Sequence, residues 1–375
     1  MTALLSRRRL PGLALAAAAI PHPGYADTGG LAELAEARGL LLGTMTVREF
    51  ARDTPQLLPL IRQDAKLLTS GWEFQWGHVQ PRPGEFHFEA GEAMVELAAR
   101  ELMPLRAHCL IWHEGLPEGF DLGSDPATAR AMMTDHISQT CRHFAGRINS
   151  WVVVNEPLMY LDHQPGNLAN TPFYRAIGPD YIRIALEAAA EADPGALLLI
   201  NEYNVEQQDS IEDTQRVMLL DLLEKLRRQG APLHALGIQG HLKTRSPPFN
   251  PERLRKFIRD VASLGLEVHI TELDVVDKAS PGNVLVRDRE VADLMYAFME
   301  VVLSEPAVTT ISTWGLDDLN TWMNFNKYTR RADSLPARGQ LYDGAFQRKP
   351  AWEAMARALR DVPVPAKFSR SWPQR

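Results

Sequence analysis

The amino-acid sequence predicts a single-domain α/β protein of the (β/α)8 TIM-barrel class, on three observations. Short apolar runs of strand length recur eight times along the 375 residues. Amphipathic stretches of helical length separate these runs, and one more follows the last of them. No Ser- or Gly-rich linker divides the chain into separate modules. Regular alternation of strands and helices in one domain favours a parallel barrel.

The expected elements follow one another with turn residues between them, such as Asp193-Pro194-Gly195 before the fifth strand. The expected strands are residues 40–45, 71–76, 104–111, 150–155, 196–201, 235–239, 266–271 and 309–314. The expected helices are residues 56–69, 90–101, 126–144, 174–192, 212–229, 251–264, 288–303 and 349–359. An open doubly wound sheet is the alternative, but residues 43–46 read Gly-Thr-Met-Thr and are not its glycine-rich phosphate loop.

The first residues have the composition of an export signal. Three arginines at positions 7–9 precede an alanine-rich apolar run over residues 10–20, and Gly24-Tyr25-Ala26 fits a cleavage site. The paired arginines favour a twin-arginine signal over an ordinary secretory one. We therefore expect residues 1–26 to be a signal peptide, 27–362 the barrel domain and 363–375 a loose C-terminal tail. The mature protein is expected to be exported, either periplasmic or secreted.

Charge and composition limit the kinds of partner that the protein is expected to bind. The chain has 40 basic and 47 acidic residues, and removal of residues 1–26 leaves 37 basic and 47 acidic ones, a net charge of −10. Nucleic acid is not expected as a partner, because phosphate binding requires a basic face. The apolar run over residues 10–20 is too short to span a membrane, so no membrane insertion is expected after signal removal. Nothing in the sequence indicates an oligomer, and a monomer is expected.

Two cysteines, Cys109 and Cys141, are too few for a disulfide scaffold. We expect two buried thiols, with a single disulfide between them as the alternative.

Functional side chains gather at the ends of the expected strands, where barrels of this class carry their chemistry. These residues are Trp72, Glu73, Gln75, His108, Trp112, His113, Asn155, Glu156, Asn201, Glu202, Tyr203, Gln239, His241, Glu272, Asp274, Trp314 and Asp318.

Two of the strand ends repeat one theme, an apolar run that leads into a glutamate. They read VVVNEP, with Glu156, and LEVHITELDV, with Glu272. Each glutamate alone could be a helix-capping acid. Two carboxylates that project into one cleft lined with tryptophan are instead what hydrolysis of a glycosidic bond requires. Aromatic rings offer flat faces to sugars, and Asn, Gln and His side chains pair with hydroxyl groups.

Histidines raise the alternative of a metal site. The stretch RAHCLIWH, with His108 and His113, lacks the pair of histidines on one helix face that binds zinc. We therefore expect no metal and no other cofactor. His269 is expected to have a structural role on its strand.

Seven segments in order carry a resemblance to a known family. They are RAHCLIWHEGLP, WVVVNEP, NEYN, GIQGH, GLEVHITELDV, TWGLDDLNTW and KPAW. Together they resemble glycoside hydrolase family 10, the retaining endo-1,4-β-xylanases, over roughly residues 31 to 360. The resemblance implies an exported retaining endo-β-1,4-glycanase that acts on xylan or a related polysaccharide and needs no cofactor.

The resemblance also implies roles for single residues. Glu156 would be the general acid/base, Glu272 the nucleophile and Asn155 a contact to the sugar 2-hydroxyl. His241 would orient Glu272 and would be steadied by Asp274. The remaining family positions would line the cleft, namely His108, Trp112, Tyr203, Gln239, Trp314 and Trp322.

The second strand departs from the family pattern. The family usually has Pro-Glu-Asn-Glu-Met-Lys-Trp there, whereas residues 70–76 read Ser-Gly-Trp-Glu-Phe-Gln-Trp. Gly71, Trp72 and Gln75 thus stand where the family binds the sugars toward the non-reducing end, and Trp72 and Gln75 become substrate-binding candidates. Gly115 and Met323 replace further family residues, and residues 324–338 form a longer and more polar stretch than the family usually has there. Two alternatives therefore stay open: a carbohydrate-binding barrel with little turnover, or a glycanase or transglycosylase that acts on a decorated β-glycan or an exopolysaccharide.

Overall fold

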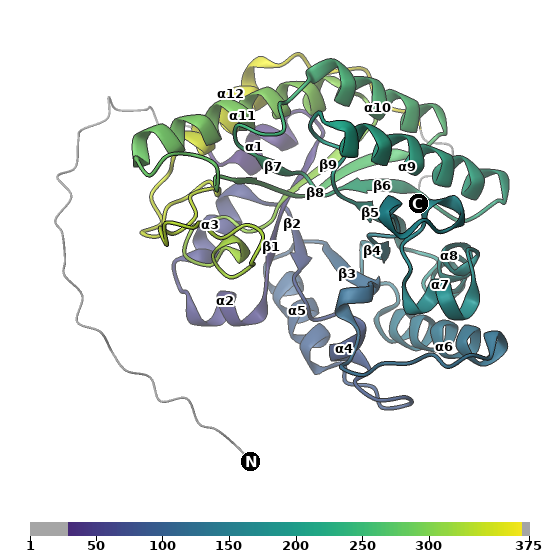
Figure 1. The fold of residues 1–375 in the computed structure, drawn as a ribbon. Helices are drawn as coiled ribbons and strands as arrows, with labels where there is room; N and C mark the ends of the chain where they lie inside the picture. Colours follow the sequence, from purple (N-terminus) through teal and green to yellow (C-terminus); the bar gives the residue numbers. More distant parts are fainter. Residues whose placement is uncertain (1–28, 370–375) are drawn as a thin grey trace.

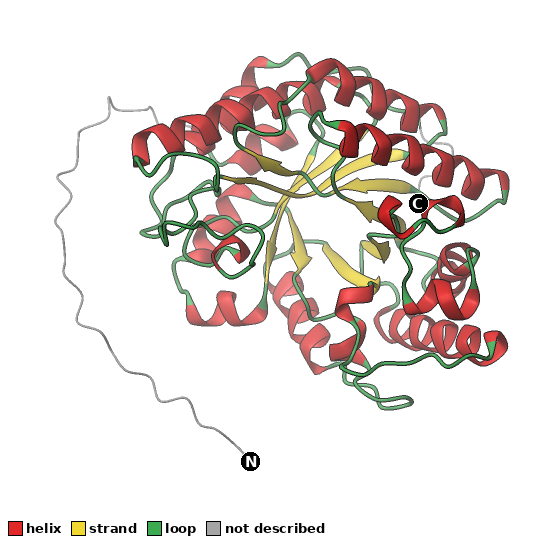
Figure 2. Ribbon diagram, in the orientation of Figure 1, coloured by secondary structure: helices red, strands yellow, loops and turns green. Residues whose placement is uncertain are grey.

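Residues 29–369 are described by a computed structural model, and they form the expected barrel. Eight parallel strands close into a ring in the order β6-β5-β4-β3-β2-β1-β9-β8, with β8 paired back to β6. Figure 1 and Figure 2 show these strands at the centre of the molecule with helices around them. The strands are β1 Leu41–Thr46, β2 Leu67–Ser70, β3 Leu105–Ile111, β4 Ser150–Asn155, β5 Leu197–Glu202, β6 Ala235–Ile238, β8 Glu267–Val276 and β9 Val308–Thr313.

One short strand, β7 (His241–Lys243), extends the barrel at its C-terminal end. It pairs in parallel with the last part of β8, so that His241 stands opposite Asp274. The pairing explains why β8 runs to Val276, well past the expected end at residue 271.

Helices surround the barrel. They are α1 Leu31–Glu36, α2 Arg48–Asp53, α3 Leu57–Asp64, α4 Trp76–Val79, α5 Glu89–Arg100, α6 Pro126–Phe144, α7 Pro172–Ile177, α8 Tyr181–Ala192, α9 Ser210–Arg228, α10 Pro251–Ser263, α11 Val284–Ser304 and α12 Pro350–Asp361. The expected helix 174–192 is in fact two helices, because Gly178 adopts a φ of 87° and Pro179 follows it. Three short helices, α1, α2 and α4, were not expected.

The second strand was placed wrongly from sequence. Strand β2 covers Leu67–Ser70 rather than residues 71–76, and α3 ends at Asp64 rather than at residue 69. A short apolar run such as Leu67-Leu68 can continue a helix or form a buried strand, and its pairing with β1 and β3 decides for the strand. Trp72 and Gln75 still lie at the C-terminal end of the barrel, but they belong to the turn after β2 and not to the strand.

Local sequence explains where the longer helices begin. The Asp125 carboxylate accepts a hydrogen bond from the Thr128 amide at 3.0 Å, and Pro126 opens α6. Asn250 and Pro251 repeat this arrangement at α10. These capped starts fix the points at which the chain leaves the C-terminal face of the barrel, where the strand ends gather.

The barrel interior contains a buried polar cluster. A nitrogen of the Arg106 guanidinium lies 2.7 Å from His269 Nδ1, and His269 Nε2 lies 2.9 Å from the Glu267 carboxylate. Burial lowers the pKa of Arg106 to about 10. These contacts agree with the structural role expected for His269.

Cys109 and Cys141 are buried and free, which confirms the expectation of two thiols. Within residues 29–369, no helix has the length and apolar character needed to cross a membrane. The expected signal peptide, residues 1–26, lies outside the described residues, so its boundary stays a prediction.

Candidate active site

A cleft of about 420 Å³ opens at the C-terminal ends of the strands. Its lining contains every residue with a predicted catalytic or substrate-binding role, except Asp274 and Trp72. The strand-end candidates without such a role that lie outside the lining are Glu73, His113, Asn201, Glu202 and Asp318. The described lining residues are Gln75, His108, Trp112, Glu114, Asn155, Glu156, Tyr203, Asn204, Gln239, His241, Lys243, Glu272, Val276, Trp314, Trp322, Asn326, Tyr328 and Thr329. The structure therefore brings together residues that lie more than 200 positions apart in the chain.

Glu272 lies on β8 and is buried at the floor of this cleft. The Asn201 side-chain amide donates to its Oε1 atom at 2.7 Å, and His241 Nε2 lies 3.3 Å from its Oε2 atom. Burial alone would raise the pKa of Glu272, but the His241 hydrogen bond, the charges of His108 and His241, and the Asn201 hydrogen bond outweigh it and hold this pKa below its usual value. Glu272 is therefore ionised near neutral pH.

His241 lies between two carboxylates. Its Nδ1 atom is 2.8 Å from Asp274 Oδ1, and Asp274 Oδ2 accepts a hydrogen bond of 2.6 Å from Trp322 Nε1. Burial would lower the pKa of His241, but the charge and hydrogen bond of Asp274, together with Glu272, raise it to about 10. The imidazole is thus a cation that stabilises the ionised form of Glu272, and Asp274 lies behind it rather than in the cleft lining.

Glu156 directly follows β4 and has a different environment. Its carboxylate accepts hydrogen bonds of 2.9 Å from Trp112 Nε1 and from Gln239 Nε2. Burial raises the pKa of Glu156, the two hydrogen bonds lower it, and the charges of Glu272 and Glu114 raise it further, for a net increase. The two candidate catalytic carboxyls thus have pKa values shifted in opposite directions, which is how one site holds an acid and an ionised carboxylate together.

The backbone at Glu156 directs its side chain into the cleft. Its φ is 54°, in the left-handed region, and its amide donates to the Asn201 carbonyl at 2.9 Å. Non-glycine residues in this region store about 1 to 3 kcal/mol of strain, and such strain concentrates at functional sites.

Asn201, at the end of β5, connects the two halves of the site. Its side-chain amide donates to Asn155 Oδ1 at 2.8 Å as well as to Glu272, while its Oδ1 atom accepts from the Thr271 hydroxyl at 2.6 Å. Sequence reasoning placed Asn201 at a strand end but gave it no role. A Cβ atom at Gly237 on β6 would lie 2.3 Å from Asn201 Oδ1, so this arrangement requires glycine at residue 237.

Trp72 is placed outside the described cleft lining, unlike Gln75. The buried Glu73 carboxylate accepts hydrogen bonds of 3.0–3.1 Å from the amides of Arg48, Gly71 and Trp72, and these fix the turn after β2. The Trp72 ring consequently packs against His78, with ring centroids 4.4 Å apart, and beneath the Arg48 guanidinium. The structure assigns Glu73, a cleft candidate from sequence, to the support of this turn.

Several cleft residues were missed from sequence, and most of them lie on connecting segments. Asn326, Tyr328 and Thr329 belong to the polar stretch after β9 that stood out as longer than in the family. Asn204 and Lys243 complete one end of the cleft, where the Lys243 ammonium donates to Asn204 Oδ1 at 2.9 Å. The unusual length of the stretch after β9 was the one signal for Asn326, Tyr328 and Thr329, whereas Asn204 stood in the segment NEYN without a role and no pattern marked Lys243.

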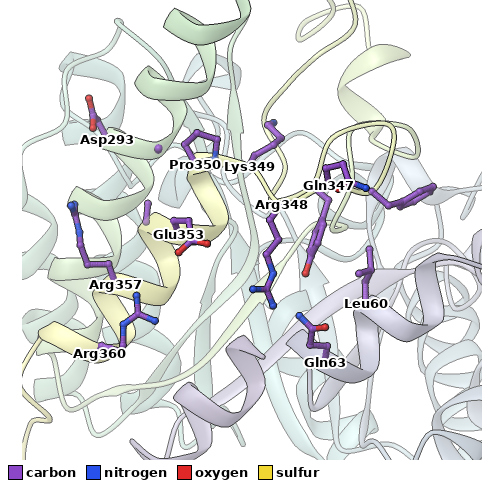
Figure 3. A pocket seen from close by; sticks show the side chains of 14 residues that line it. Leu60, Gln63, Asp293, Gln347, Arg348, Lys349, Pro350, Glu353, Arg357 and Arg360 are labelled. Carbon is purple, nitrogen blue, oxygen red and sulfur yellow. The ribbon is translucent and has the colours of Figure 1, made fainter. Parts of the chain in front are cut away.

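A second depression, of about 760 Å³, lies beside α3, α11 and α12 and contains none of the predicted site residues (Figure 3). Two of its arginines lie over aromatic rings: Arg348 is 3.5 Å from the centroid of Trp352, and Arg357 is 3.8 Å from that of Tyr296. These contacts are typical of a packed surface. The cleft with Glu156 and Glu272 is therefore the candidate active site.

Comparison with known proteins agrees with this geometry. The family model described as glycosyl hydrolase family 10 matches residues 30–358. Endo-1,4-beta-xylanase B of Thermotoga neapolitana is 29% identical over 315 residues, 82% of this chain and 85% of that protein. Endo-1,4-beta-xylanase A of Phanerodontia chrysosporium is 30% identical over 337 residues, which cover 88% and 77% of the two chains.

A solved structure, xylanase 10B from Thermotoga petrophila RKU-1 in complex with xylobiose, superposes with a TM-score of 0.79 at 27% identity and covers 90% of this chain and 98% of its own. The chain therefore belongs to glycosyl hydrolase family 10 and is a glycoside hydrolase.

Proposed function

We propose that this protein is an exported endo-1,4-β-xylanase that hydrolyses xylan, or a closely related β-1,4-glycan, with retention of anomeric configuration. The observation that carries the proposal is the pair Glu156 and Glu272, which face one cleft and have pKa values shifted in opposite directions. Export is proposed from the composition of residues 1–26.

The first step uses both carboxyls at once. Glu156 donates its proton to the glycosidic oxygen as the bond to the anomeric carbon breaks, and the Glu272 carboxylate attacks that carbon from the opposite face. The leaving chain departs with a new hydroxyl group, and a glycosyl ester remains on Glu272. His241 favours this step because its positive charge keeps Glu272 ionised until the attack.

The second step reverses the protonation of Glu156. Once Glu272 is esterified its negative charge is gone, so the pKa of Glu156 falls and its carboxylate can take a proton from water. The resulting hydroxide attacks the anomeric carbon and releases Glu272. Two inversions at one carbon give net retention.

The lining of the cleft supports a neutral sugar chain as the substrate. Trp112, Trp314 and Trp322 offer apolar faces, and Asn155 and Gln239 offer amide groups that can pair with hydroxyls. The solved neighbour with bound xylobiose and the xylanases among the relatives favour xylose units.

A second candidate is a glycanase or transglycosylase specific for a decorated β-glycan. The turn after β2 favours it, because Trp72 is directed to His78 and Arg48 and this turn contributes Gln75 to the described lining. A carbohydrate-binding barrel with little turnover is less well supported, since both carboxyls and their hydrogen-bond partners are in place.

Hydrolysis tests the proposal. Mature protein and Glu272→Ala are incubated with xylan and a panel of other β-1,4-glycans, and the first products are examined by NMR. Release of β-configured xylooligosaccharides, lost in Glu272→Ala, is the expected result. Hydrolysis of another glycan but not of xylan would favour the second candidate. No hydrolysis of any glycan in the panel would favour the carbohydrate-binding barrel.

Export is tested separately. Expression of the full chain in a bacterium with a twin-arginine pathway is expected to yield periplasmic or secreted protein that begins at Asp27. Uncleaved cytoplasmic protein would contradict this part of the proposal.

A further inference from the structure

The chain between β9 and α12 forms a wall over one side of the cleft. We call residues 324–336 the wall loop. Arg331 anchors this loop to the segment after β8, because its guanidinium donates to the Asp277 carbonyl at 2.5 Å and to the Ser280 carbonyl at 2.9 Å. The Asp333 carboxylate balances the guanidinium charge at 2.6 Å. Side-chain contacts therefore hold the wall loop in place against the barrel.

Tyr328 is the residue of this loop that combines exposure with a place in the cleft lining. Its side chain is 72% exposed, yet it lines the same cleft as Glu156. Its backbone is held on both sides: the Lys278 ammonium donates to the Tyr328 carbonyl at 2.9 Å, and the Tyr328 amide donates to Asn326 Oδ1 at 2.8 Å. A fixed backbone thus presents an aromatic ring to solvent at the rim of the cleft.

Phe325, three residues earlier, offers an internal comparison. It is 77% exposed but lies outside the described cleft lining. The exposed fractions of Phe325 and Tyr328 are therefore similar. The two residues differ in that only Tyr328 belongs to the described cleft lining.

Tyr328 lies toward the side of the cleft on which the leaving group departs. Tyr203 follows β5, the strand next to the one that ends before Glu156. Next to Tyr203, Asn204 Oδ1 accepts a hydrogen bond from Lys243, and Lys243 stands opposite Val276, two residues before the Lys278 that holds the Tyr328 carbonyl. The two tyrosines therefore share the part of the cleft beside Glu156, which protonates the leaving oxygen.

We propose that Tyr328 is a sugar-binding platform that holds the leaving-group end of the polysaccharide and makes the enzyme prefer long chains. The inference rests on the proposed function and adds a residue that selects substrates by length. An aromatic ring binds the apolar C–H face of a sugar, and the Lys327 ammonium, 4.8 Å from the Tyr328 centroid, makes a further contact with the ring. Because the backbone is fixed beforehand, little ordering of the loop opposes binding.

Binding is measured first, so that the test does not depend on turnover. Titration calorimetry with xylohexaose is carried out on the mature Glu272→Ala protein, alone and combined with Tyr328→Ala, Tyr328→Phe or Phe325→Ala. We expect Tyr328→Ala to raise Kd by about three- to tenfold, since an aromatic contact contributes an effect of that size. Tyr328→Phe keeps the ring and should stay close to the parent, as should Phe325→Ala.

Kinetics with active enzyme supply a result that a merely structural defect would not give. Tyr328→Ala should lower kcat/KM for xylohexaose by a similar factor and lower it much less for 4-nitrophenyl β-xylobioside, because the nitrophenol leaving group has no further sugar to bind. Phe325→Ala should leave both values unchanged. Equal Kd values for Tyr328→Ala and Phe325→Ala would overturn the proposal. Equal losses on both substrates, or no binding of xylohexaose at all, would also overturn it.

The outcomes separate this inference from the proposed function. If Tyr328→Ala hydrolyses xylohexaose as fast as the wild type does, Tyr328 is not a sugar-binding platform, and the proposed xylanase activity still holds. If xylohexaose binding depends on Tyr328 but the wild type does not hydrolyse xylohexaose, the platform is supported and the proposed activity is rejected.

Discussion

His241 and Asp274 form the contact that controls the charge of the active site, with His241 Nδ1 2.8 Å from Asp274 Oδ1. On its other side, His241 Nε2 lies 3.3 Å from Glu272 Oε2. Asp274 thereby acts on Glu272 through an imidazolium, although it stands outside the described cleft lining.

Asp274→Asn tests this relay through its pH dependence. Loss of the Asp274 charge lowers the pKa of His241 from about 10, and Glu272 then loses its positive neighbour, so that its pKa rises. Because Glu272 must be ionised to attack in the proposed mechanism, the acidic limb of the kcat/KM profile should move to higher pH. We expect activity at neutral pH to fall by about 10- to 100-fold, the effect of a hydrogen bond between charged groups. An acidic limb that stays in place would show that Asp274 does not act on Glu272.

Glu156→Ala should be sensitive to the leaving group. In the proposed mechanism Glu156, whose pKa is raised, supplies the proton that a sugar leaving group needs, so the basic limb of the wild-type profile should reflect its ionisation. The variant should lose most activity on xylooligosaccharides, keep much more of the first step on a 2,4-dinitrophenyl glycoside, and show no basic limb. Added azide should restore turnover of the activated substrate. Equal losses on both substrates would contradict the role of Glu156 as the acid.

Gly237→Ala should damage the active site from within the barrel wall. The new Cβ atom would lie 2.3 Å from Asn201 Oδ1, and Asn201 donates to both Asn155 and Glu272. We expect kcat to fall by about 10- to 100-fold, since a shift of about 1 Å in an active site has effects of that size. Gly195→Ala is the matched control, because its nearest contact would be Asp193 Oδ1 at 3.7 Å. Wild-type kcat in Gly237→Ala would mean that Asn201 does not position the site.

Asp64 is predicted to be a major contributor to stability rather than to catalysis. Its buried carboxylate accepts hydrogen bonds from the Leu31 amide at 3.0 Å, from Trp352 Nε1 at 2.8 Å and from the Tyr342 hydroxyl at 2.5 Å. Asp64→Ala leaves three donors without this acceptor and should lower the free energy of unfolding by about 3 to 5 kcal/mol.

Denaturant unfolding measures this free energy. The control Asp221→Ala, at an exposed position of α9, should stay within about 0.5 kcal/mol of wild type. Similar unfolding free energies for the two variants would contradict the assignment of Asp64.

The elements that carry the carboxyl pair could be predicted from sequence because their signals are local. The stretch Ser150–Asn155 was expected as a strand with these bounds, since its apolar run ends abruptly at a polar pair. Strand β8 was expected only to residue 271. Its last residues are a strand because they pair with β7, and no pattern in the chain marks β7.

The placement of Trp72 and Tyr328 could not be predicted, because contacts between distant residues decide it. The direction of the Trp72 ring depends on the bond from the Arg48 amide to Glu73, which joins residues 25 positions apart. The place of Tyr328 depends on Arg331 and Lys278, which attach the wall loop to the segment after β8. Such contacts between segments leave no periodic pattern in the chain.

In the proposed mechanism Glu272 forms a covalent intermediate with the sugar, and chemical trapping would identify the residue that carries it. The mature protein is incubated with 2,4-dinitrophenyl 2-deoxy-2-fluoro-β-xylobioside, digested and examined by mass spectrometry. We expect inactivation with a single fluoroxylobiosyl group on the peptide that contains Glu272, and no label in Glu272→Ala. A label on Glu156 instead, or turnover of xylan by Glu272→Ala at the wild-type rate, would contradict it.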